Sequence, residues 1–380
     1  MMMKDNKKPE WAPKEDNQAF TSFVREGIKG GHDGTDFLVG EKEKKQEKKV
    51  PRRATLTVDD YVQGVLENNR TILARTITLV ESNLPRHIEM AQKVLNKLLP
   101  NTGKSIRIGI TGVPGVGKST FIEAFGSLLC DAGHRVAVLA VDPSSSLTKG
   151  SILGDKTRME KLTQNQNAFI RPSPSGGALG GVTRKSRETI LVCEAAGYDV
   201  ILVETVGVGQ NEIAVRSMVD FFLLLMLTGA GDELQGLKKG VVEIADAILV
   251  NKSDGKNKIS ALTAVSEYKR ILHVLQPATE GWESKAMACS ALYEEGLNEV
   301  WEMIQSFIEI TNLSGVYEER RKKQNVQWME SMVKEYLHTR FFSNEKVKAH
   351  KAMIEEEVIS GKLSVTLAAQ QLLDAYEEGE

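Results

Sequence analysis

The sequence predicts an α/β fold, a doubly wound domain with a mostly parallel sheet over about residues 105–312, with helical extensions on both sides. Two observations predict this class. Short and nearly continuous apolar runs recur along the stretch, as expected for strands that are buried on both faces of a parallel sheet. Helix-like segments separate several of these runs, which is typical of βαβ units with right-handed crossovers and helices on both sheet faces.

Six segments have the apolar character of buried strands. They are IRIGIT at 106–111, RVAVLAVD at 135–142, DVILVETVG at 199–207, DFFLLLML at 220–227, DAILVNKSD at 246–254 and KAMACSA at 285–291. The stretch STFIEAFGSLLCDAG, which follows the first of them, has helical spacing instead. The alternation predicts a strand, a crossover helix and a second parallel strand.

The segments on either side of this domain differ from it in composition. Residues 1–55 form a charged tail with too little periodic apolar content to fold, so we expect disorder there. Residues 56–104 show apolar positions at helical spacing and predict two or three amphipathic helices. Residues 313–380 are highly charged with scattered apolar positions, and they predict helices that pack outside the sheet. These positions are Val326, Met329, Met332, Val333, Leu337 and Phe341.

Charge and composition exclude several classes of partner. The formal net charge of -2 and the pI of about 6.4 predict no nucleic-acid partner and no attraction to a membrane surface. The most apolar run, 219–227, is far shorter than the roughly 20 residues that span a bilayer. The N-terminus has neither a secretory nor a transit pattern, so we expect a cytoplasmic protein. Cys130, Cys193 and Cys289 are far apart and are expected to be reduced, structural thiols.

The stretch GVPGVGKST fits the pattern G-x-x-x-x-G-K-S directly after a predicted strand and directly before a predicted helix. In that context, glycines let backbone N–H groups surround phosphate oxygens, and the helix N-terminus adds its positive end. Lys118 supplies a cation to the β and γ phosphates, and Ser119 is a magnesium ligand. The predicted phosphate-binding loop consists of Gly112, Val113, Pro114, Gly115, Val116, Gly117, Lys118, Ser119 and Thr120.

The stretch NKSD, at the end of a later strand, predicts which base is bound. The carboxylate of Asp254 is an acceptor that can pair with the ring N–H and the amino group of guanine, and adenine offers no such pair. Asn251 is expected to orient the base and the loop, while the stem of Lys252 lies against the ring. The nucleotide is therefore predicted to be GTP or GDP. The stretch CSAL adds Ser290, Ala291 and Leu292, with the last two backbone N–H groups expected near the guanine carbonyl.

Three acidic residues follow strands or glycine-marked loops, namely Asp142 in VDPSSS, Asp155 in GDKTRM and Glu204 in VETVGVGQ. Mg²⁺ prefers oxygen ligands and commonly takes one or two carboxylates directly. With Ser119, these residues form the predicted magnesium set. Helix capping or turn chemistry is the alternative for Asp142 and Asp155.

The residue that activates water is not evident from the sequence. Glu204 and Gly207 stand where many GTPases have a D-x-x-G element, but Val208 replaces the glutamine that follows it in Ras-like proteins. Gln210 comes two places later. Intrinsic hydrolysis is therefore expected to be slow, on the order of one turnover per minute or less. Four basic residues are further candidates for stabilising the transition state, with a solvated surface charge as the alternative for each: Arg158, Arg184, Lys238 and Lys239. The glycine-rich stretch at 173–182 is either a phosphate-facing loop or a surface connection.

These motifs, taken in order, resemble the MeaB/ArgK family of P-loop GTPases. The resemblance runs from about Val58 to near Tyr336 and rests on GITGVPGVGKST, VDPSSS, GSILGDKTRM, FIRPSPSGG, VETVGVGQ, GAGDELQGLKKG and NKSD. It implies a chaperone that uses GTP binding and slow hydrolysis to gate the loading, protection and reactivation of adenosylcobalamin-dependent methylmalonyl-CoA mutase. It also implies a homodimer joined through the C-terminal helices, with Ser119, Asp142, Asp155 and Glu204 associated with Mg²⁺. The residues expected to serve hydrolysis are Lys118, Glu204, Gly207, Gln210 and Lys238.

Other functions remain as alternatives. The client could be a related cobalamin-dependent acyl-CoA mutase, since the surface that selects it is not a motif. An amino-acid transport system kinase would need a phosphoacceptor or substrate-binding feature, and no kinase catalytic loop is present in the sequence. A nickel-insertion GTPase would need clustered His and Cys ligands, whereas the six histidines are dispersed. A GTP sensor without useful turnover is the remaining alternative, which Val208 leaves open.

Overall fold

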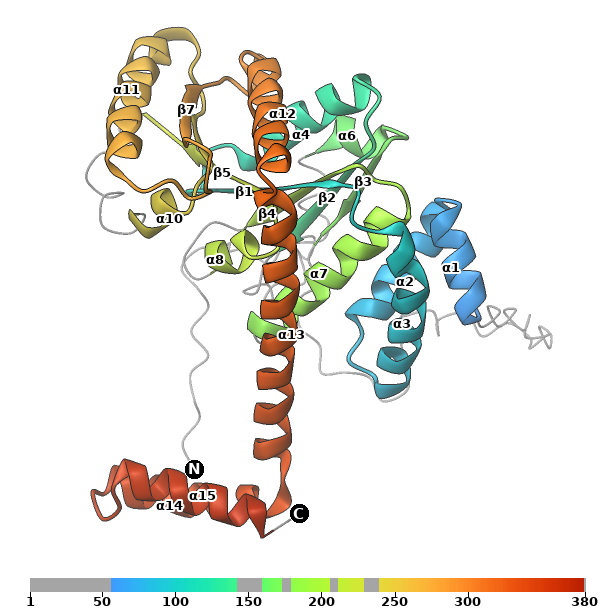
Figure 1. Ribbon diagram of the computed structural model, residues 1–380, viewed down its shortest axis with the longest axis vertical. Helices are drawn as coiled ribbons and strands as arrows, with labels where there is room; N and C mark the ends of the chain where they lie inside the picture. The colour runs from blue at the N-terminus through green and yellow to red at the C-terminus, as the bar shows by residue number, and fades with distance from the viewer. Residues whose placement is uncertain (1–55, 142–158, 173–178, 206–210, 229–238, 379–380) are drawn as a thin grey trace, which may run out of the picture. The chain divides into compact units, whose positions relative to one another are not determined.

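A computed structural model describes residues 56–141, 159–172, 179–205, 211–228 and 239–378. In this part of the chain, seven parallel strands form one sheet in the order β3-β2-β4-β1-β5-β6-β7 (Figure 1). The strands are β1 (Ile106–Gly112), β2 (Val136–Val141), β3 (Ala168–Arg171), β4 (Val200–Thr205), β5 (Phe221–Met226), β6 (Ala247–Val250) and β7 (Lys285–Ala288). The predicted doubly wound α/β class is confirmed.

Helices cover both faces of the sheet, and each face has its own apolar core. One core joins the strands to α1 (Val58–Leu66), α2 (Arg70–Glu81), α3 (Pro85–Leu98), α7 (Leu179–Ala195), α8 (Asn211–Arg216), α10 (Lys239–Glu243) and α11 (Lys258–Val274). The other core contains side chains of α4 (Lys118–Asp131), α6 (Glu160–Gln164) and α12 (Leu297–Leu313). Successive side chains of a strand point to opposite faces, so Phe221 belongs to the second core and Phe222 to the first. This two-sided burial explains the continuous apolar runs.

Local signals start the three helices that precede β1. Thr57 forms a capping box with Asp60 at the start of α1, and Asn69 caps α2 by accepting hydrogen bonds from two backbone N–H groups. Pro85 occupies the first turn of α3, where its missing N–H costs no helical hydrogen bond. The prediction of two or three helices over 56–104 is therefore confirmed.

Two local predictions need correction. The strand β3, only four residues long and at the edge of the sheet, is absent from the six strands expected from the sequence. The sequence predicts either a phosphate-facing loop or a surface connection over 173–182, whereas α7 begins at Leu179. A run as short as AFIR carries almost no periodic signal, and two glycines in the first turn of α7 conceal the start of that helix.

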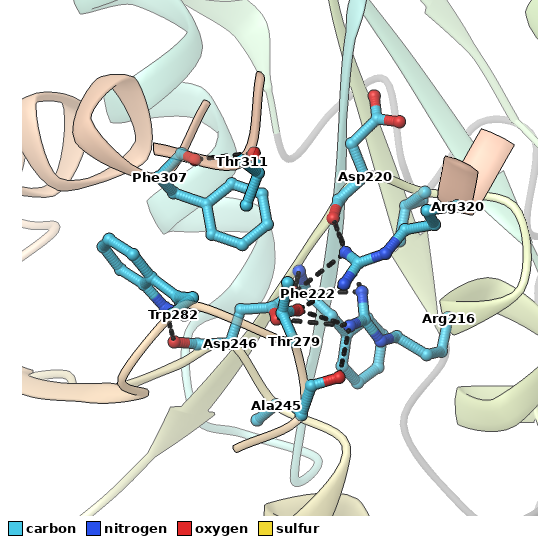
Figure 2. A network of polar contacts seen from close by, with 12 residues as sticks. Arg216, Asp220, Phe222, Ala245, Asp246, Thr279, Trp282, Phe307, Thr311 and Arg320 are labelled. Carbon is cyan, nitrogen blue, oxygen red and sulfur yellow. Dashed lines mark hydrogen bonds and ion pairs between the residues drawn. The ribbon is translucent and has the colours of Figure 1, made fainter. Parts of the chain in front are cut away.

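A buried polar network joins the amino ends of β5 and β6 to the C-terminal helices (Figure 2). Asp246, which directly precedes β6, has no exposed surface; its Oδ2 lies 2.9 Å from Nη1 of Arg216 and accepts a 2.8 Å hydrogen bond from the Phe222 N–H. Its Oδ1 accepts from Thr279. Arg320, on α13 (Val316–Ser343), lies 4.0 Å from the same carboxylate and donates to Thr279. A guanidinium from α8 and one from α13 thus share a single carboxylate.

Asp220, which precedes β5, is the second carboxylate at this edge, and it is 1% exposed. Its oxygens accept from Arg321 at 2.8 and 2.6 Å, from the Arg107 N–H at 2.8 Å and from the Tyr317 hydroxyl at 3.0 Å. Burial alone would raise the pKa of Asp220, but the hydrogen bonds and charge of Arg321 outweigh it and hold the pKa below its ordinary value of 3.8. The first turns of α13 are thereby tied to the sheet.

The remainder of α13 differs from its first turns. Gln324 is buried and donates to the Val219 carbonyl. Further along, four apolar side chains spaced by three or four residues are half exposed: Val326 at 51%, Met329 at 58%, Val333 at 52% and Leu337 at 55%. The predicted helix beyond residue 313 is present outside the sheet, with these four side chains half exposed on it.

The chain ends with α14 (Glu345–Ile359) and α15 (Val365–Glu377), which pack against each other. Asn344 and Ser364 cap these two helices through side-chain oxygens. Among the residues described, no helix combines the length and the apolar character needed to cross a membrane.

Candidate nucleotide-binding site

The predicted phosphate-binding loop connects β1 to α4 and is shaped by glycines. Gly115 and Gly117 have φ angles of +79° and +95°, values that side chains with a Cβ rarely adopt. A Cβ on Gly117 would lie 2.8 Å from Nδ2 of Asn251, so this position also requires a close approach to the second motif. The side chain of Val116 points into the core with no exposed surface, while Pro114 is exposed. The loop is therefore anchored at Val116 and exposed at Pro114 and Gly115.

Lys118 begins α4 and is half buried. Its Nζ donates to the carbonyls of Gly112, at 3.0 Å, and Val113, at 3.3 Å. Burial lowers the pKa of Lys118, while the charges of Glu204 and Glu212 act in the opposite direction. An ammonium group that donates to backbone carbonyls in this way can exchange them for phosphate oxygens, so Lys118 suits the predicted contact with the β and γ phosphates.

The NKSD stretch follows β6 and is bonded directly to the phosphate-binding loop. Asn251 is 1% exposed, and its Nδ2 donates to the Val116 carbonyl at 2.8 Å. Lys252 donates through Nζ to the Gly115 carbonyl at 2.9 Å. Its backbone has a φ of +59°, the left-handed region that favours glycine. The structure thus brings the two motifs, which are more than 130 residues apart, into one site.

The CSAL stretch follows β7 and supports the same loop. Oδ1 of Asn251 accepts from the Ala291 N–H at 3.1 Å and from the Cys289 thiol at 3.7 Å. The hydroxyl of Ser290 donates to Oδ2 of Asp254 at 2.6 Å. Leu292 is 70% exposed. The Ala291 N–H, which we expected near a guanine carbonyl, therefore has Asn251 as its partner.

The predicted magnesium and hydrolytic residues are described only in part. Ser119 lies in the first turn of α4, half buried, and Thr120 beside it is exposed. Glu204 is 8% exposed on β4, in register with Ile110 of β1. The remaining predicted residues lie outside the described part of the chain: Asp142, Asp155, Arg158, Gly207, Gln210 and Lys238. In the described ranges, no group of three or more His, Cys, Asp and Glu side chains could hold a metal ion.

Several residues near the site were not anticipated. The buried hydroxyls of Thr111 and Thr205, at the ends of β1 and β4, form a 2.7 Å hydrogen bond. Glu212 on α8 is 1% exposed, and its Oε2 has no hydrogen-bond partner among the described residues. Arg184, which was a candidate for hydrolysis from the sequence, lies 3.9 Å from Glu188 on the same helix, α7. Nothing in the sequence distinguishes the two threonines and Glu212 from many others, because the threonines meet only when β1 and β4 pair and Glu212 is buried only when α8 packs against the sheet.

The geometry is that of a P-loop joined to a guanine-type base loop, and comparisons with known proteins agree. The model of the family described as "Methylmalonyl Co-A mutase-associated GTPase MeaB" matches residues 73–346. The chain belongs to the MeaB family. This MeaB-family chain is 49% identical over 318 residues to a probable GTPase of Mycobacterium tuberculosis, a match that covers 84% of this chain and 95% of the relative. Relatives named as GTPases and the P-loop fold identify it as a GTPase that binds GTP and GDP.

Two further relatives are informative. The MeaB-family chain is 44% identical over 329 residues to the mouse protein named methylmalonic aciduria type A homolog, mitochondrial, covering 84% of this chain and 79% of the mouse protein. It is also similar to a crystal structure described as a LAO/AO transport system kinase. That structure has a TM-score of 0.69 and 37% sequence identity, covering 84% of this chain and 99% of the solved one. The similarity thus extends over most of the chain.

Proposed function

We propose that this GTPase is a chaperone of adenosylcobalamin-dependent methylmalonyl-CoA mutase, using GTP binding and slow hydrolysis to gate cofactor loading, protection and reactivation. The observation that supports the choice of nucleotide is the bonding of Asn251 and Lys252 to the phosphate-binding loop, because Asp254 belongs to the same NKSD stretch. The choice of client rests on the family description and on the name of the mouse relative. A related cobalamin-dependent acyl-CoA mutase is the alternative client.

In this proposal the phosphate groups lie over the backbone of residues 112–117, with Lys118 beside the β and γ phosphates. Asp254 pairs with the guanine ring N–H and amino group, while the Ser290 hydroxyl donates a hydrogen bond to Oδ2 of the same carboxylate. Ser119, Asp142, Asp155 and Glu204 hold Mg²⁺, directly or through water. When bound, Mg²⁺ offsets the negative charge that develops on the phosphate oxygens.

Hydrolysis is assigned to Lys118, Glu204, Gly207, Gln210 and Lys238. Val208 occupies the place of the Ras-like glutamine, which supports slow basal turnover that a partner accelerates. In this proposal Lys118 stabilises the negative charge of the phosphates, and Glu204, which is buried on β4, orients water. The protein would then act as a GTP-dependent switch whose GTP-bound state persists because hydrolysis is slow.

We assign homodimer formation to residues 313–380, as part of a division into a charged tail at 1–55, N-terminal helices at 56–104 and a GTPase domain at 105–312. The half-exposed row of Val326, Met329, Val333 and Leu337 supports this, because such spacing on a helix forms a seam that a second helix can cover. The proposal places the dimer in the cytoplasm.

The test is GTP hydrolysis by the purified protein, alone and with adenosylcobalamin-dependent methylmalonyl-CoA mutase, with ATP as the control nucleotide. We expect slow turnover that is specific for GTP and rises with the mutase. Lys118→Ala should abolish tight GTP binding, Asp254→Asn should weaken the preference for guanine, and Lys256→Ala, an exposed lysine of the same loop, should change neither. Unchanged affinity in the first two variants would overturn the site.

The same assay separates the other candidate function. The similar crystal structure is described as that of a transport system kinase, and a kinase would transfer the phosphoryl group to a protein. Labelled phosphate on a protein acceptor, with no acceleration by any cobalamin-dependent mutase, would favour that function. Release of free phosphate in proportion to GTP consumed would exclude it.

A further inference from the structure

Asn257 lies between the base loop and α11, and it contacts the loop in three ways. Its backbone N–H donates to the Asp254 carbonyl at 2.9 Å. Its side-chain Nδ2 donates to the Lys252 carbonyl at 2.7 Å. Its Oδ1 accepts from the hydroxyl of Thr228, also at 2.7 Å. One residue therefore holds the carbonyls on both sides of Ser253 and joins them to the residue that follows β5 by two positions.

Asn257 is the last residue of the 3-10 turn η3 (Gly255–Asn257), which runs directly into α11, so its backbone is already helical, with φ of -84° and ψ of -10°. Its side chain forms no cap hydrogen bond to α11. Asn69 and Asn344, by contrast, precede α2 and α14 with extended backbone, and each accepts from two backbone N–H groups of its own helix. The two polar groups of the Asn257 amide contact the Lys252 carbonyl and the Thr228 hydroxyl instead.

The backbone that Asn257 holds is in a conformation that needs support. Lys252 has a φ of +59°, which costs free energy for a residue with a Cβ. Two residues later the chain must present the carboxylate of Asp254, whose bidentate contact tolerates little displacement. The hydrogen bond from Asn257 to the Lys252 carbonyl fixes the orientation of the peptide between Lys252 and Ser253, which connects the left-handed residue to Asp254. Thr228, which follows β5, donates to Asn257. β5 lies beside β1 in the sheet, and the phosphate-binding loop follows β1.

We propose that Asn257, held by Thr228, is a positioning residue for base selection: it orients the Asp254 carboxylate toward the two adjacent N–H donors of guanine. The inference rests on the proposed binding of guanine nucleotides by Asp254. Asn257 itself does not touch the base. Its effect is therefore expected on discrimination between bases, more than on the phosphate contacts that all nucleoside diphosphates share.

The test compares GDP with IDP, which keeps the ring N–H but lacks the amino group, by titration calorimetry on the full-length protein. Asn257→Ala should weaken GDP binding about tenfold and IDP binding about threefold or less, so that the GDP/IDP affinity ratio falls. Thr228→Val should lower the ratio about twofold to threefold in the wild-type background and should have no effect in the Asn257→Ala background. Asn344→Ala removes a helix cap far from the loop in sequence and is the matched control.

The outcomes separate the two proposals. The inference is supported if Asn257→Ala lowers the GDP/IDP affinity ratio while the Asn344→Ala control lowers the melting temperature as much and keeps the wild-type ratio. An Asn257→Ala protein that loses stability and keeps the wild-type ratio would overturn it, because a purely structural role predicts that result. A wild-type protein with equal affinity for GDP and IDP would instead overturn the proposed contact of Asp254 with guanine.

Discussion

The two ends of the parallel strands are built differently. At the amino ends of β5 and β6, Asp220 and Asp246 are buried and paired with guanidinium groups from α8 and α13. Figure 2 shows the contacts of Asp246. At the carboxyl ends, the cationic and amide side chains contact backbone carbonyls of the neighbouring loop. The first arrangement satisfies charge with charge. The second leaves the charge of Lys118 without a hydrogen-bonded carboxylate among the described residues.

The difference explains how one sheet can be stable at the amino ends of its strands and still rearrange its side chains around a nucleotide at their carboxyl ends. Breaking a buried ion pair leaves an uncompensated charge, so the amino end has a single stable arrangement. A lysine that donates to carbonyls can turn to an incoming phosphate at little cost, because the carbonyls retain other donors or water. We therefore expect substitutions at the amino end to lower stability, and substitutions at the carboxyl end to lower nucleotide affinity.

The largest effect is expected for Asp246→Ala. The change leaves Arg216 and Arg320 without their shared carboxylate and deprives the Phe222 N–H of its acceptor. Removing one partner of such a pair costs about 3–5 kcal/mol of unfolding free energy. Denaturant unfolding followed by circular dichroism measures it. The GDP affinity of the folded protein should stay within about twofold of wild type; a stability loss below about 1 kcal/mol would contradict the assignment.

Gly117→Ala should show the reverse pattern. A Cβ at a φ of +95° costs about 1–2 kcal/mol, and here it would also lie 2.8 Å from Nδ2 of Asn251. We expect GDP affinity to fall by about tenfold or more. Gly133→Ala is the matched control, because Gly133 has a φ of +93° with no atom within 4 Å of the added Cβ. If both variants bind GDP like the wild type, the close approach has no role in binding.

Acid should act through Asp220. Its folded-state pKa lies below the ordinary value of 3.8, so the carboxylate contributes stability above that value, and this contribution is lost as the pH falls through the folded pKa. The Asp220→Asn protein should be less stable than wild type at neutral pH and should lose less stability between about pH 5 and about pH 3. Unfolding free energies across that range measure the slopes. Parallel curves would show that other carboxylates control acid unfolding.

The smallest effect is expected for Trp282→Phe. The indole Nε1 donates to the Asp246 carbonyl at 2.9 Å, while its ring packs edge to face on Phe307 with centroids 5.2 Å apart. Phenylalanine keeps an aromatic ring and loses the hydrogen bond, which is worth about 1 kcal/mol. Thermal unfolding is sensitive enough to resolve this loss. A loss equal to that of Asp246→Ala would mean that ring packing, and not the carboxylate, holds this edge.

The sequence predicted elements whose signal is local and missed those that depend on pairing. Strands β1, β2 and β4–β7 were predicted because burial on both faces leaves continuous apolar runs. β3 was missed because a four-residue edge strand has almost no run to detect. In the site, Lys118 and Asp254 belong to spaced motifs, whereas Asn257 and Thr228 meet only after β5 and β6 pair. The exposure of α13 was also missed, because an amphipathic pattern does not say what covers it.

The three cysteines are all buried, and one of them, Cys289, lies in the CSAL stretch that contacts the base loop. The Cys289 thiol donates to Oδ1 of Asn251, and burial raises its pKa to about 12. A thiol in that state reacts slowly with electrophilic reagents until the loop opens. Cys289 is therefore a native probe of local opening, because the rate at which it is alkylated reports how often the base loop opens. Cys193, in α7, is the internal standard that reports opening of the core.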